Sequence, residues 1–448
     1  MSPLKRKIRA GLLVAPLLAL SAMAVGVEGA AAQPPEAAPT PVHATATTPA
    51  SSAAPTAAAG GRGWTAGWIA SPQRASAGFE PNWSEEGFSQ HSVRQVVRMT
   101  AGGSALRVRL SNLYGTSPLR LTGATVARAG DGASIRPGSL RHLTFGRTRS
   151  TLVPAHGQAA SDPVPLQVEP MESLTVTLYF AGTTGPATFH SQAYATSYRA
   201  AGDHRDDQGG AAFTRTTHSW YYLTGVDVIG GAGGRGAVVA FGDSITDGFG
   251  STNDAGNRYP DELAELLAAA GDPRPVLNAG IGGNMVLNDS AWYGERSTAR
   301  FRRDVLDQPG ASTVIVLEGV NDIGFSESDT PTYKPNPVVS AREMIDGHRR
   351  LIREAHARGV KVIGATLLPF KGSDHWGEHA AAVSDELNRW IRTSGEYDAV
   401  ADLDRAMAAP SDPDLLDPAY DSGDKLHPND AGYRAMSQAV ATALRLSE

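Results

Sequence analysis

Four short stretches in the second half of the 448-residue chain place reactive or polar side chains after apolar runs or in turns. Ser244 follows the run Ala237 to Phe241, and Asp424 precedes His427 by three residues. A serine hydroxyl is a poor nucleophile until a base takes its proton, and an imidazole held by a carboxylate can act as that base. This spacing predicts a nucleophilic serine, with His427 as general base and Asp424 as the group that orients it.

Each stretch also has a purely structural reading. Ser244 could cap the following helix, and Asn321 could close a turn. Gly283 could serve backbone shape, and Asp424 with His427 could be a surface capping pair. The joint occurrence of all four stretches favours catalysis. Asp243 and Asp322, beside two of them, are predicted to be structural acceptors.

The elements around these stretches predict how they come together. The run Ala237 to Phe241 has no alternation, which is typical of a strand buried on both faces of a parallel sheet. Further apolar runs alternate with helical patterns, such as the helix opening at Pro260 and the last helix after Asn429. This alternation predicts a three-layer α/β/α domain with about five parallel strands. The stretches should then meet at the carboxyl edge of the sheet. Further strands are predicted at Val276 to Ala279, Val314 to Leu317, Val360 to Ala365 and Ala399 to Leu403.

These motifs resemble the SGNH or GDSL hydrolases, a family of serine esterases and lipases. Ser244 lies in the nucleophile block, Gly283 in the glycine block, Asn321 in a Gly-x-Asn-Asp block, and Asp424 with His427 in an Asp-x-x-His block. The resemblance implies a flavodoxin-like fold and an oxyanion hole made by the backbone N–H groups of Ser244 and Gly283 and the side-chain amide of Asn321. Ile245 stands where the family name implies leucine, next to the reacting group. No Gly-x-Ser-x-Gly elbow occurs, which disfavours the commoner α/β-hydrolase lipase fold.

The first half of the chain predicts export and a separate domain. Residues 1–32, with a basic start, an apolar stretch and small residues, look like a secretory signal peptide, and residues 33–62 like a disordered Ala/Pro/Thr-rich linker. Alternating runs in residues 63–229 predict an all-β sandwich, jelly-roll-like, with half-buried strands. Residues 230–236 are predicted to be a glycine-rich hinge before a hydrolase domain at residues 237–448. The family resemblance extends to secreted bacterial members with an N-terminal β domain.

Composition limits the partners. With 40 basic and 46 acidic residues the net charge is −6, which disfavours nucleic acid. No long apolar run follows the first, so no transmembrane segment is expected after signal cleavage. The chain has no cysteine, so an exported form needs no disulfides. We expect no cofactor and no metal, because serine chemistry needs none.

The remaining histidines and aromatic residues receive less specific predictions. His375 and His379, in a segment that could border the acyl pocket, are predicted to lie at the surface, and His348 and His356 to be solvated on a charged helix. The tryptophans at 64, 68 and 83 could stack on sugars, although packing is favoured. Trp220, Tyr221 and Tyr222 are predicted to join the two domains.

Together these observations predict a secreted serine esterase or lipase that acts on small-molecule or lipid carboxylic esters, with short to medium acyl chains favoured. A carbohydrate acetyl esterase acting on acetylated polysaccharide is the alternative enzyme. A glycan- or wall-binding protein with a degenerate hydrolase domain is the alternative from another class.

Overall fold

The computed structural model describes residues 63–230 and 235–447, so the predicted signal peptide, the predicted linker and most of the predicted hinge lie outside the described residues. We call residues 63–230 the β half and residues 235–447 the α/β half. The described residues of both halves belong to one compact unit.

The β half contains strands and no helix among its described residues. Its strands are β1 (Trp64–Ile69), β2 (His91–Arg98), β3 (Gly103–Ser111), β4 (Leu119–Leu121), β5 (Gly123–Arg128), β6 (Arg141–His142), β7 (Thr151–Val153), β8 (Gln158–Ala160), β9 (Val164–Val168), β10 (Ser173–Phe180), β11 (Phe189–His190), β12 (Ser197–Ala201), β13 (Arg215–Thr217), β14 (Trp220–Tyr221) and β15 (Leu223–Ile229). A five-stranded sheet has the order β1-β15-β3-β8, with β9 also on β3, and a six-stranded sheet has the order β13-β12-β2-β10-β5-β6. Neighbouring strands in both sheets are antiparallel.

Alternating apolar residues of the two sheets share one core. Leu106 and Val108 of β3 and Val176 and Leu178 of β10 belong to the same buried cluster. The alternation is therefore the one the sequence predicts. The prediction that these strands are half-buried is wrong for β10, where Thr177 on the other face is also buried. The buried Arg94 guanidinium covers that face and donates to the Thr177 hydroxyl at 3.0 Å.

The aromatic residues of the β half mostly pack inside it. Trp68 meets Trp220 edge to face at 4.8 Å, and Trp83 stacks on Tyr221 at 5.4 Å. Packing was the favoured prediction for Trp68 and Trp83, which are both buried. The predicted joining role is wrong for Tyr221 and Tyr222, because both lie in the core of the β half. Trp220 does reach across, since the Arg258 guanidinium of the α/β half lies 6.0 Å from its ring.

A parallel sheet forms the centre of the α/β half. Its strands are β16 (Ala237–Gly242), β17 (Val276–Gly280), β18 (Ala311–Leu317), β19 (Lys361–Ala365) and β20 (Ala399–Ala401). The order β17-β16-β18-β19-β20 and the parallel pairing confirm the predicted five-stranded sheet. The last residue of β16, Gly242, is level with Gly280 and Leu317, the last residues of its two neighbours. Loops that follow these strands therefore start side by side.

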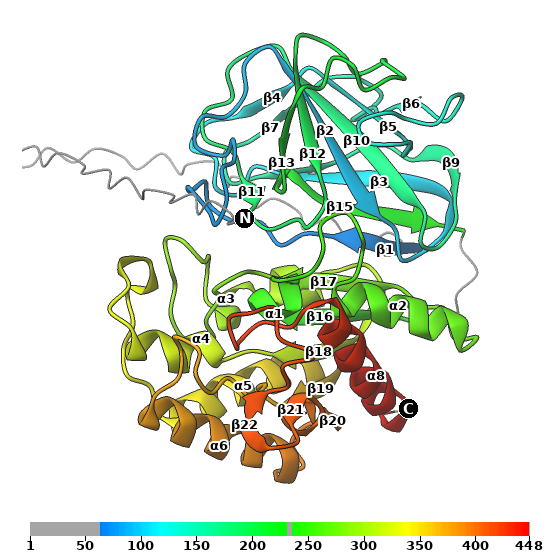
Figure 1. Cartoon of the computed structure of the whole chain (residues 1–448). Helices are drawn as coiled ribbons and strands as arrows, with labels where there is room; N and C mark the ends of the chain where they lie inside the picture. Colours follow the sequence, from blue (N-terminus) through cyan, green and yellow to red (C-terminus); the bar gives the residue numbers. More distant parts are fainter. Residues whose placement is uncertain (1–62, 231–234, 448) are drawn as a thin grey trace, which may run out of the picture. The chain divides into compact units, whose positions relative to one another are not determined.

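Helices cover both faces of this sheet (Figure 1), with α2 and α8 on one face and α5 and α6 on the other. They are α1 (Ser244–Asp247), α2 (Tyr259–Ala269), α3 (Ser297–Phe301), α4 (Val320–Gly324), α5 (Ala341–His356), α6 (Glu378–Thr393), α7 (Leu403–Met407) and α8 (Asp430–Leu446), with the π-helical turn η1 (Arg302–Leu306) and the 3₁₀ turns η2 (Phe325–Glu327) and η3 (Pro331–Tyr333). A short hairpin joins β21 (Ala408–Ala409) and β22 (Asp412–Leu416). None of the helices described is long and apolar enough to cross a membrane.

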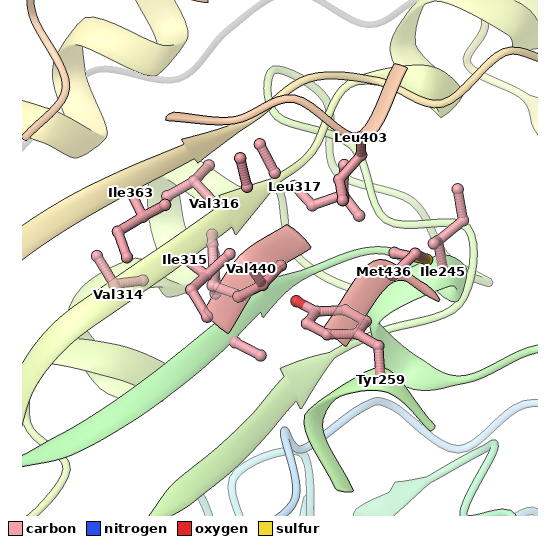
Figure 2. Packing of buried hydrophobic residues seen from close by; sticks show 14 of the residues in the cluster. Ile245, Tyr259, Val314, Ile315, Val316, Leu317, Ile363, Leu403, Met436 and Val440 are labelled. Atoms are coloured by element: carbon pink, nitrogen blue, oxygen red, sulfur yellow. The ribbon is translucent and has the colours of Figure 1, made fainter. Parts of the chain in front are cut away.

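Local sequence signals explain where the longer helices begin. Ser340 and Glu343 form a capping box at the start of α5, and the Asn429 side chain accepts from the Gly432 N–H at the start of α8. Figure 2 shows Val440 of α8 beside Ile315 of β18 and Met436 of α8 beside Ile245, within one buried cluster. The three layers predicted from alternation are therefore packed through the apolar faces that the sequence indicates.

The two halves also share a core. Ala66 and Ile69 of β1 belong to the same buried cluster as the parallel sheet. The Ala66 N–H donates to the Pro309 carbonyl at 2.9 Å, and the Thr100 hydroxyl donates to the Val276 carbonyl at 2.9 Å. Strand β17 of the α/β half is therefore anchored on the β half at its first residue, Val276, at the end away from the loop that carries Gly283.

Candidate active site

Ser244 stands at the first position of α1, directly after β16. The Asp243 carboxylate caps this helix by accepting from the Ile245 N–H at 2.9 Å, as predicted for a structural acceptor. Gly242 is required here, because a Cβ atom at this position would lie 2.1 Å from the Thr246 hydroxyl and 2.5 Å from the Leu317 carbonyl oxygen. The sharp exit from β16 therefore presents Ser244 beyond the carboxyl edge of the sheet.

His427 lies within hydrogen-bond distance of both Ser244 and Asp424. Its Nε2 is 2.8 Å from Ser244 Oγ, and its Nδ1 is 2.6 Å from Asp424 Oδ2. The carboxylate accepts from Nδ1–H, so Nε2 is free to accept the Ser244 hydroxyl proton. The structure thus brings together the three side chains that the sequence predicts, over a separation of more than 180 positions.

The turn before α8 fixes the Asp424 carboxylate. Its Oδ1 accepts from the backbone N–H groups of Leu426 and His427 at 3.0 and 2.8 Å. Burial raises the pKa of Asp424, but the hydrogen bonds and the charge of His427 outweigh it and lower this pKa to about 2. The carboxylate is therefore ionised at neutral pH.

Gly283 lies in the loop after β17 with φ of +73°, a conformation that glycine adopts freely. A Cβ atom at Gly283 would lie 2.4 Å from the Tyr293 ring. Neither the Gly283 N–H nor the Ser244 N–H has a hydrogen-bond acceptor within residues 63–230 and 235–447. The Ile281 N–H donates to the Gly242 carbonyl at 3.1 Å, so the loop of Gly283 starts beside the strand end that leads to Ser244.

Asn321, in the first turn of α4, is buried and held at both ends of its amide. Its Nδ2 donates to the Asn284 carbonyl at 2.9 Å, and its Oδ1 lies 3.1 Å from His375 Nε2. The neighbouring Asp322 accepts from the N–H groups of Val286 and Leu287, which confirms its predicted structural role. The amide of Asn321 is thereby tied to the loop that carries Gly283.

The prediction that His375 is a surface residue is wrong. Its side chain is only 4% exposed, and its Nδ1 lies 2.7 Å from an Asp374 carboxylate oxygen. The hydrogen bond with His375 holds the pKa of Asp374 at about 2. Asp374 holds the His375 ring, and His375 in turn holds the side-chain amide of Asn321. Asp424 holds the His427 ring in the same way. No local signal indicates this, because His375 and Asn321 are 54 positions apart.

The other histidines of the α/β half include two near the surface and one in the core. His379 is exposed and faces the Val339 carbonyl oxygen, and His356 pairs with Asp398 near the surface, as predicted. The prediction for His348 is wrong, because it is fully buried with Nδ1 2.6 Å from the Tyr397 hydroxyl. In the part of the chain that the structure describes, no three acidic or histidine side chains gather as metal ligands.

Arg300 is a further buried residue that the sequence did not single out. Its guanidinium donates to the carbonyls of Gly242 and Ala279 at 2.8 and 2.7 Å, and its Nε donates to Asn284 Oδ1 at 2.8 Å. It also pairs with Glu318 at the end of β18. One fully buried cation therefore joins the ends of three strands and the loop of Gly283.

Residues 240–435 match the GDSL-like Lipase/Acylhydrolase family. The α/β half carries a GDSL-family domain. The family predicted from the motifs is therefore confirmed, and the matched range contains all five predicted site residues.

Relatives of the GDSL domain include named acetylxylan esterases. The chain is 25% identical over 229 residues to an acetylxylan esterase of Xylanibacter ruminicola, across 46% of this chain and 43% of that protein. It thus spans less than half of this relative's length. Among solved structures, the acetyl xylan esterase AlAXEase is 23% identical with a TM-score of 0.37, covering 46% of this chain and 99% of the other. An acetylxylan esterase from Geobacillus stearothermophilus is also 23% identical, with a TM-score of 0.36, covering 48% and 95%.

Proposed function

We propose that the chain hydrolyses carboxylic esters through an acyl-enzyme on Ser244. The observation that carries this proposal is the unbroken contact from Ser244 Oγ to His427 Nε2 and from His427 Nδ1 to Asp424. A nucleophile, its base and the group that orients the base are the minimum set for acyl transfer.

The proposed reaction proceeds in two halves. His427 Nε2 takes the Ser244 proton while Oγ attacks the ester carbonyl carbon, and the resulting imidazolium is stabilised by Asp424. His427 then gives that proton to the oxygen of the departing alcohol. In the second half His427 takes a proton from water, the resulting hydroxide attacks the acyl carbon, and Ser244 leaves with the proton from His427.

The second requirement is stabilisation of the negative charge that develops on the carbonyl oxygen. The N–H groups of Ser244 and Gly283 supply two donors. Asn321 Nδ2 carries two hydrogens, of which the Asn284 carbonyl takes one, so the other can serve the oxyanion. Donors fixed in advance by neighbouring groups need no reorganisation when the charge develops.

Replacement of Ser244 by alanine tests the nucleophile. Ser244→Ala should abolish hydrolysis of p-nitrophenyl acetate, and the thermal transition should stay nearly unchanged, because the hydroxyl contributes only its bond to His427. Turnover that survives in this variant would overturn the assignment. A panel of aryl esters of increasing chain length, triglycerides and phospholipids measures the acyl preference, for which we propose short to medium chains.

The second candidate is an acetyl esterase acting on acetylated polysaccharide. Two observations favour it: the relative from Xylanibacter ruminicola is named an acetylxylan esterase, and one aromatic ring, that of Phe79, stays exposed near the loop of Gly283. Phe79 of the β half is 42% exposed and stacks on Tyr293, which packs against Gly283. Aromatic faces suit pyranose rings. Acetylated xylo-oligosaccharides should outcompete p-nitrophenyl acetate if this candidate is right.

Two further proposals concern the β half and residues 1–32, and one alternative function is disfavoured. We interpret the β half as a jelly-roll-like sandwich, supported by two antiparallel sheets that share one core. We propose export on the pattern of residues 1–32 alone. A glycan-binding protein with a degenerate hydrolase domain is disfavoured, because the residues that catalysis needs are present and in contact.

A further inference from the structure

His190 of the β half reaches into the GDSL domain. It ends strand β11, and its Nε2 lies 3.0 Å from Asp247 Oδ1 on α1. The two side chains are 4% and 1% exposed. A buried histidine and carboxylate from different halves of the chain thus meet three residues after Ser244.

Both ring nitrogens of His190 face acceptors. Nδ1 lies 2.9 Å from the Ser71 carbonyl oxygen, and Nε2 faces the Asp247 carboxylate. The Ser71 carbonyl oxygen cannot donate, so Nδ1 carries a hydrogen; with Asp247 as a carboxylate, Nε2 carries one too, and the ring is an imidazolium. Burial and the Arg258 charge lower the pKa of His190, but Asp247 and the Ser71 carbonyl outweigh them, so this pKa is raised. The contact is therefore a buried ion pair.

The Asp247 carboxylate also binds the loop that carries Gly283. Its other oxygen, Oδ2, accepts from the Gly282 N–H at 3.0 Å. Gly282 itself has no room for a side chain, because a Cβ atom there would lie 1.8 Å from Gln192 Oε1 and 2.9 Å from the Phe79 ring. The Ile281–Gly282 peptide, one before the peptide that carries the Gly283 N–H, is thus held by a hydrogen bond to Asp247, and Gly282 is covered by residues of the β half.

We propose that His190 is a positioning residue for ester hydrolysis: through Asp247 it holds the Gly282 peptide and so aims the Gly283 N–H at the developing oxyanion. This inference rests on the proposed function. A buried carboxylate that loses its cationic partner must find another donor or take up a proton. Either change releases Gly282, and an oxyanion donor acts only within narrow limits of distance and direction.

The test separates positioning from simple attachment of the two halves. His190→Ala and the milder His190→Gln should lower kcat for p-nitrophenyl acetate by ~10–100-fold while KM changes less than about twofold, because ground-state binding does not depend on the oxyanion donor. Thr100→Val is the matched control, since it breaks a buried contact between the halves, to Val276, without touching the loop. Its kcat should stay within about twofold of that of the original chain.

A double-variant cycle tests whether His190 acts through Asp247. Asp247→Ala removes the acceptor of the Gly282 N–H and should lower kcat at least as much as His190→Ala. The double variant should be no slower than Asp247→Ala alone, because the two residues act in series. If the fold-losses of kcat in the two single variants multiply in the double variant, His190 acts independently of Asp247, which would overturn the proposal.

Two further results decide the matter. Equal losses of kcat in His190→Gln and Thr100→Val, with equal shifts of the thermal transition, would reduce His190 to an attachment point and overturn the proposal. An unchanged kcat in a folded His190→Gln variant would do the same. Failure of the proposed function looks different, because the original chain would then cleave no ester, or Ser244→Ala would retain turnover.

Discussion

The Asn321 amide depends on a neighbour that sequence order hides. His375 Nε2 faces Asn321 Oδ1, and this leaves Nδ2 directed toward Asn284 and the site. The motif identified Asn321 because its neighbours in sequence are distinctive. His375 has no such context, and its burial follows only from the packing of Phe325 and Tyr333 around it. The motif residues could therefore be predicted, whereas His375, which holds one of them, could not.

Replacing His375 should weaken catalysis without removing it. His375→Ala frees the Asn321 amide to rotate, so kcat for p-nitrophenyl acetate should fall by ~10-fold, less than the ~10²–10³ typical of losing an oxyanion donor outright. His379→Ala is the control in the same segment, because His379 is exposed and contacts only the Val339 carbonyl. Equal kcat values for the two variants would contradict a role for His375 in holding Asn321.

At the scale of elements, the strands and long helices of the α/β half could be predicted from the spacing of apolar residues. Strand β16 begins at Ala237, where its apolar run begins, and helix α8 follows Asn429 as predicted, because burial against the sheet sets both patterns. Helix α5 was predicted from the same pattern, yet the placement of His348 on it was wrong. His348 lies among charged residues in sequence, but its ring faces Tyr397, which follows helix α6 and is 49 positions away. Charge along a helix indicates its solvent side only on average.

The buried His348 predicts how stability depends on pH. Burial lowers its pKa to about 4 in the folded chain, against a backbone hydrogen bond to Glu318 that raises it. An unfolded histidine takes up a proton near pH 6.5, so the unfolded state binds more protons between about pH 6.5 and 4. Stability should be unaffected above this window and fall within it, by up to about 3 kcal/mol.

Urea unfolding at pH 7.5 and 4.5 measures this loss. His348→Gln should reduce the difference between the two pH values, since glutamine does not titrate. His356→Gln on the same helix is the control, because His356 is 44% exposed and already paired with Asp398. The same acid loss in His348→Gln as in the original chain would show that other groups cause it.

At the scale of the whole molecule, the two halves are more interdependent than the glycine-rich segment suggests. Sequence texture changes sharply between them, and this predicted two folding units. The contacts that join them come from single residues of otherwise ordinary strands, such as Ala66 and Thr100, and from loops such as the one with Phe79. Pairings over such separations leave no local pattern, so the shared core could not be predicted.

Separation of the halves is therefore expected to disable the GDSL domain. Residues 236–448 expressed alone would expose the surface of β17 that packs on β1, and the Asp247 carboxylate would lose His190. Exposed apolar surface of this kind promotes aggregation. We expect this fragment to be insoluble or to hydrolyse p-nitrophenyl acetate at least ~10-fold more slowly than the full chain, and co-expression with residues 63–230 to restore solubility and turnover. A soluble fragment with the kcat and acyl preference of the full chain would mean that the β half takes no part in the site.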